Sequence, residues 1–64
     1  MPLFPTLGPE ERLLVEVIRL KGAADLDVLC AESRMTPHVA ADLLLNLEFT
    51  GVLRTLPGKL YALN

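Results

Sequence analysis

The spacing of the apolar residues changes at Gly51, and this change most constrains what the chain can fold into. Before Gly51, apolar residues recur at intervals of three and four, which predicts amphipathic helices. After it the period changes from 3.6 to 2, which predicts two short strands at residues 52–56 and 59–63. Helices followed by a single hairpin predict a mainly helical α+β domain.

Proline and glycine mark where the first predicted helix begins and ends. Residues 9–21 form this helix, with Pro9 in the first turn, Gly8 or Thr6 as the cap and Gly22 as the stop. The residues before it, 1–8, are interpreted as a linker, so the folded domain is predicted at residues 9–64.

Two further caps define the remaining helices. Asp25 is a good N-cap for a helix at residues 26–33, and Thr36 followed by Pro37 predicts a sharp start for a helix that ends near Thr50. The order of helix, helix, short turn, helix and hairpin predicts a winged helix-turn-helix, with the hairpin as a β-hairpin wing.

Each helix has an apolar stripe that we expect to face the core. The predicted core residues are Leu13, Leu14, Val17, Ile18, the stem of Lys21, Leu26, Leu29, Cys30, Met35, Val39, Ala40, Leu43, Leu44 and Leu47. Val15 and Leu20 lie off the first stripe.

A second apolar strip lies on the third helix, where Leu45 and Phe49 are four residues apart and Ala41 precedes them. Two interpretations stay open. Either the strip is a surface for a partner protein or a second copy, or the first helix or the hairpin covers it.

Two turns carry unusual residues. Arg34 stands where a helix-turn-helix often has glycine, so either the turn differs or Arg34 adopts a left-handed conformation that costs roughly 1 kcal/mol. Pro57 cannot adopt the positive φ of a type I′ turn, which predicts a loop longer than two residues with Gly58 in the left-handed region.

The charge balance argues against a strongly basic nucleic-acid binder. Six basic and eight acidic residues give a net charge of −2. The predicted third helix carries Asp42 and Glu48 but no Lys or Arg, so docking of this helix in a major groove is unfavourable.

A weak basic patch remains, made of Arg34, His38, Arg54 and Lys59. It predicts either low-affinity, salt-sensitive DNA contact or an ordinary solvated face, with a phosphate at the start of the third helix as one variant. Tyr61 fits stacking on a base or the edge of the core.

No set of residues predicts catalysis or a bound cofactor. Ser33 is expected to end a helix and Asp25 to cap one, and a single Cys and a single His are too few for a tetrahedral metal site. Cys30 is interpreted as a small packed residue. The sequence shows no signal peptide and no apolar run of membrane-spanning length, which predicts a cytoplasmic-type domain without enzyme activity.

Two runs of residues resemble a known family. They are Leu44-x-x-Leu47-Glu48-x-x-Gly51-Val52-Leu53-Arg54, continued by Leu56-Pro57-Gly58-x-x-Tyr61-x-Leu63, and Leu26-Asp27-x-Leu29-Cys30, followed by Met35-Thr36-Pro37-x-Val39. Over residues 8–63 the chain resembles the C-terminal winged-helix domain of the bacterial DNA-processing protein A (DprA/Smf) family. It departs from the family in having Arg34 in place of glycine and Cys30 in place of alanine.

The resemblance implies a role in natural transformation and DNA recombination. Proteins like this bind incoming single-stranded DNA and help load the recombinase RecA onto it, mainly through a Rossmann-like domain that lies outside this chain. Residues 1–8 would then be the linker from that domain.

The resulting hypothesis is an accessory interaction domain of a DprA-like protein. It would act by protein docking or self-association, with at most weak DNA contact through the basic patch. The residues expected to dock are Leu45, Phe49, Ala41 and Val15, with Leu3 and Phe4 of the linker. The alternative hypothesis is the DNA-binding winged-helix module of a small transcription regulator.

Overall fold

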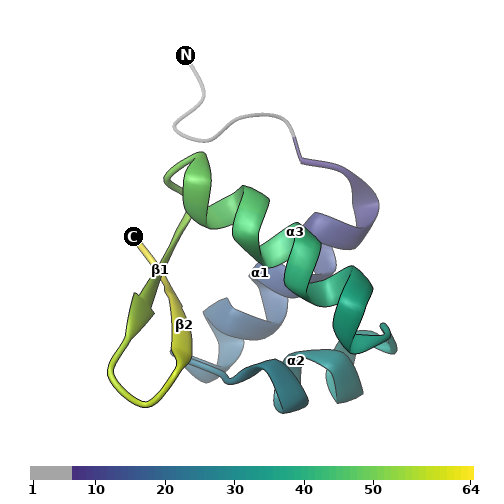
Figure 1. The fold of residues 1–64 in the computed structure, drawn as a ribbon, viewed down its shortest axis with the longest axis horizontal. Helices are drawn as coiled ribbons and strands as arrows, with labels where there is room; N and C mark the ends of the chain where they lie inside the picture. Colours follow the sequence, from purple (N-terminus) through teal and green to yellow (C-terminus); the bar gives the residue numbers. More distant parts are fainter. Residues whose placement is uncertain (1–6) are drawn as a thin grey trace.

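The computed structural model describes residues 7–64, which form three helices and one antiparallel hairpin (Figure 1). The elements are α1 (Pro9–Lys21), α2 (Leu26–Ser33), α3 (Pro37–Phe49), β1 (Leu53–Leu56) and β2 (Leu60–Leu63). This order confirms the predicted winged helix. The first two helices have the predicted bounds, whereas α3 ends one residue before Thr50 and each strand starts one residue late. Leu3, Phe4 and Thr6 lie outside the described residues.

Capping interactions explain why each helix starts where it does. Gly8 precedes α1, and its N–H donates to Glu11 Oε1 at 3.1 Å. Asp25 Oδ1 accepts a hydrogen bond from the N–H of the third residue of α2 at 2.9 Å, and Thr36 Oγ1 does the same for α3 at 3.4 Å. Because these bonds satisfy N–H groups that have no partner within the helix, they fix the entry of the chain into each helix.

The core lies where the three helices meet the hairpin. Its buried residues are Leu14, Ile18, Ala24, Leu29, Ala40, Leu44, Leu47, Val52, Leu53 and Ala62. The predicted stripes were wrong at Leu13 and Val39, which are 50% and 39% exposed, and at Lys21, which is exposed. Leu13 and Val39 each precede a buried residue and lie about 100° round the helix from it, so they point toward solvent.

The hairpin is tied to the helices through the backbone of Tyr61. Leu53 pairs with Leu63 in the β1–β2 register, and on the other side of β2 Tyr61 exchanges two hydrogen bonds with Ala24, at 3.0 and 2.8 Å. Ala24 belongs to the connection between α1 and α2, so this bridge holds the wing against the start of α2. The hairpin loop spans residues 57–59, with Gly58 at φ 88° and Lys59 at φ 60°, which confirms the predicted longer loop.

The turn between α2 and α3 confirms a left-handed Arg34. Its φ and ψ are 58° and 42°, and its N–H donates to the carbonyl of Cys30, which also accepts the N–H of Met35 at 3.1 Å. A single left-handed residue therefore closes α2 and turns the chain into α3.

The strain at Arg34 predicts that Arg34→Gly raises the free energy of unfolding by about 0.5–1 kcal/mol, because glycine adopts this conformation without a Cβ clash. Urea unfolding followed by circular dichroism measures the change. Ala31→Gly on the exposed side of α2 is the control and should lower stability by about 0.8–1 kcal/mol. A loss of stability in Arg34→Gly would contradict the described turn.

Neighbouring leucines of α3 provide a second test. Leu44 is fully buried and Leu45 is 67% exposed. Leu44→Ala should lower the free energy of unfolding by about 2–5 kcal/mol because it opens a cavity, whereas Leu45→Ala should change it by less than about 0.5 kcal/mol. The same unfolding measurement compares the two, and equal losses would show that α3 is rotated from the described orientation.

Candidate interaction surface on the third helix

One face of α3 packs on the core and the opposite face is open to solvent. Ala40, Leu44 and Leu47 are fully buried on the inner face. On the outer face, Leu45 is 67% exposed, Phe49 is 90% exposed, and Ala41 is exposed as well. We call Ala41, Leu45 and Phe49 the α3 strip. Within residues 7–64, the alternative that the first helix or the hairpin covers the strip is wrong.

Neighbouring elements hold both flanks of α3 in place. On the α1 side, Asn46 Nδ2 donates to Glu11 Oε2 at 3.1 Å. On the hairpin side, Thr55 Oγ1 donates to Glu48 Oε2 at 3.4 Å. The α3 strip therefore sits on a helix that is packed beneath and bonded on both sides, so its geometry is fixed before any partner arrives.

Val15 does not belong to this surface. It lies on α1, is half-buried and packs against the core, so little of its side chain is available to a partner. Leu20 on α1 is 71% exposed, in keeping with its position off the first stripe, and it is not part of the strip.

The outer face of α3 carries acidic groups but no Lys or Arg. His38 Nε2 lies 3.6 Å from Asp42 Oδ2, and both side chains are largely exposed. These carboxylates make the approach of a phosphate backbone along α3 unfavourable.

The four predicted basic residues do not form one cluster. Arg34 and His38 lie at the α2–α3 turn and the first turn of α3, whereas Arg54 and Lys59 belong to the hairpin. Figure 1 shows the α2–α3 turn and the hairpin at opposite sides of the molecule. Each pair is exposed, and at the start of α3 the Thr36 hydroxyl and the missing N–H of Pro37 already reduce what an anion could bind.

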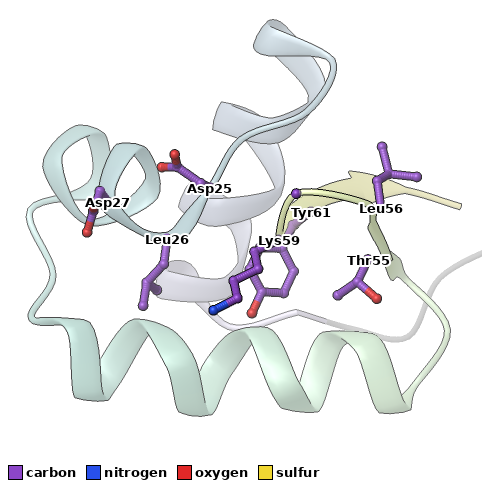
Figure 2. A pocket seen from close by; sticks show the side chains of 8 residues that line it. Asp25, Leu26, Asp27, Thr55, Leu56, Lys59 and Tyr61 are labelled. Atoms are coloured by element: carbon purple, nitrogen blue, oxygen red, sulfur yellow. The ribbon is translucent and has the colours of Figure 1, made fainter.

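A shallow groove of about 630 Å³ runs between the start of α2 and the hairpin (Figure 2). Its lining residues are Asp25, Leu26, Asp27, Thr55, Leu56, Gly58, Lys59 and Tyr61. Tyr61 packs against the core, as expected for a core-edge residue. The sequence did not indicate this groove, because the Ala24–Tyr61 bridge that forms it joins residues far apart in the chain.

Several other polar side chains have structural partners. Ser33 Oγ donates to the Leu29 carbonyl, and Asp25 caps α2. Arg19 donates two hydrogen bonds to Glu16 at 2.8 and 3.1 Å, and these bonds hold the pKa of that carboxyl below its usual value. Within residues 7–64, no group of three His, Cys, Asp or Glu side chains is arranged to hold a metal ion. Among the same residues, no helix has the length and apolar character required to cross a bilayer.

Comparison with known protein families gave a match. The family model described as the DprA winged helix domain matches residues 2–59 of the chain. Neither a search of curated proteins nor a search of solved structures returned a match. The matched range includes all three helices and the first strand, with the basic residues and the strip described above.

Proposed function

The chain belongs to the DprA winged helix domain family, and from this premise we propose that it is the accessory interaction domain of a DprA-type DNA-processing protein. It acts by protein docking or self-association through the α3 strip, with at most weak DNA contact. In its bacterial cytoplasmic setting, the full protein would handle single-stranded DNA and load RecA during natural transformation, and this domain would supply a contact between proteins.

The observation that carries the proposal is the exposure of Phe49. Phe49 is 90% exposed, and Leu45, four residues before it, is 67% exposed. Together they form an apolar patch that has no structural role in the isolated fold. Aromatic side chains are enriched at the centres of protein interfaces and contribute much of their binding energy. A DNA-reading helix would instead present Arg, Lys, Asn or Gln along this face.

The wing favours a minor second function. Arg54 and Lys59 are exposed on the hairpin, and a winged-helix hairpin with free cations can contact phosphates. Two cations give little affinity and a strong dependence on salt. This contact would accompany the docking function. The same wing residues are the feature that supports the alternative hypothesis of a DNA-binding regulator module.

The docking proposal predicts that Leu45→Asp combined with Phe49→Asp removes protein association and leaves the fold intact. Sedimentation velocity of the chain, and photo-crosslinking from position 49 in the native host, measure association, while circular dichroism monitors folding. Leu20→Asp on α1 is the control, since Leu20 is 71% exposed, close to the 67% of Leu45, but lies outside the strip. Unchanged association and crosslinking in the double variant would contradict the proposal.

The minor DNA contact predicts weak binding that is lost as salt rises. Fluorescence anisotropy with labelled single- and double-stranded oligonucleotides, at low and near-physiological salt, measures it. Arg54→Ala with Lys59→Ala should reduce the slope of log K against log salt concentration by up to the amount expected for about two phosphate contacts. Tight binding that survives physiological salt would show instead that the domain is primarily a DNA reader.

A further inference from the structure

The carboxylates of α3 are placed symmetrically around the α3 strip. On a helix with about 100° per residue, Ala41 and Phe49 lie about 40° to either side of Leu45. Asp42 and Glu48 lie about 60° to either side, so each forms one edge of the strip. The strip is therefore an apolar band about 12 Å long with one carboxylate along each edge.

Within residues 7–64, neither carboxylate has a Lys or Arg partner. Asp42 faces His38 at 3.6 Å, and Glu48 accepts a hydrogen bond from the Thr55 hydroxyl. Arg34 lies in the α2–α3 turn that precedes α3, and Arg54 and Lys59 belong to the hairpin. Arg54 and Thr55 are consecutive in β1, so their side chains lie on opposite faces of the hairpin. Lys59 lines the groove beside Leu26 and Tyr61. The negative charge at both edges of the strip is thus available to a partner.

A second copy of this chain fits the strip poorly. A symmetric contact places the same surface on both sides, so the Asp42 and Glu48 carboxylates of two copies would gather round one apolar centre with no Lys or Arg from either α3.

We infer that the α3 strip is the docking site for a basic amphipathic helix of another protein, one whose apolar stripe is bordered by Lys or Arg. The inference rests on the proposed docking function and specifies its partner. Apolar residues of that helix would cover Leu45 and Phe49 and fit over the small Ala41, while its cations would pair with Asp42 and Glu48 at the edges. Such an interface is apolar at the centre and charged at the rim, as helix-in-surface contacts commonly are.

Two synthetic helical peptides test this partner chemistry. Both carry the same leucine stripe over about 14 residues, enough to span the strip, and their flanking positions are all Lys in one and all Glu in the other. Fluorescence anisotropy of each labelled peptide, titrated with the whole chain, should show at least about tenfold tighter binding of the Lys peptide. Phe49→Ser should weaken that binding by at least about tenfold.

Replacing the two carboxylates at the edges of the strip by lysines distinguishes recognition by the strip from attraction by the net charge of the chain. Asp42→Lys with Glu48→Lys should reverse the preference in favour of the Glu peptide. Asp27→Lys with Glu32→Lys changes the net charge equally at exposed positions on α2 and should leave the preference for the Lys peptide in place. Circular dichroism confirms that each variant is folded before it is compared.

The inference is overturned if the two peptides bind equally or if neither peptide binds. It is also overturned if the charge exchange on the strip and the control exchange change the preference between the peptides to the same extent. The proposed docking function fails separately. If no peptide binds but Phe49→Ser still abolishes self-association in sedimentation velocity, a second copy is the occupant and only the basic-helix inference is wrong. If a DNA duplex binds and Phe49→Ser weakens it, both are wrong.

Discussion

The packing of one face of α3 against α1, α2 and the hairpin is the interaction on which the rest of the structure depends. Leu44 and Leu47 are fully buried there together with Leu14 and Ile18 of α1. A domain of this size has so little interior that a helix can bury one face and no more. The outer face of α3 is consequently left in water, and its apolar residues are available for binding.

Two local devices keep that arrangement rigid. The left-handed Arg34 closes α2 and directs α3 across the core, and the Ala24–Tyr61 bridge ties the wing to the start of α2. Both use backbone hydrogen bonds, so the outer face of α3 is presented by a framework that does not depend on the residues displayed there.

The sequence was sufficient to predict the elements and insufficient to predict the relations between distant ones. Caps such as Asp25, the proline at the start of α3 and the glycines act locally, so the helices could be placed to within a residue. For Arg34 the sequence left two alternatives, a different turn or a left-handed residue, and the structure shows the second. Leu13 and Val39 were misplaced because a stripe of apolar residues does not specify its rotation against neighbours. The separation of Arg34 from Arg54, and the pairing of Ala24 with Tyr61, depend on tertiary packing that no local pattern encodes.

In the proposed function, the outer face of α3 contacts protein rather than DNA. An NMR titration of the isotope-labelled chain tests it most directly, with chemical shifts followed residue by residue as a DNA duplex or the Lys-flanked peptide is added at low salt. The peptide should shift the resonances of Ala41, Leu45 and Phe49, whereas the duplex should leave them in place and perturb only the wing. Saturable shifts along the whole strip on adding the duplex would contradict it.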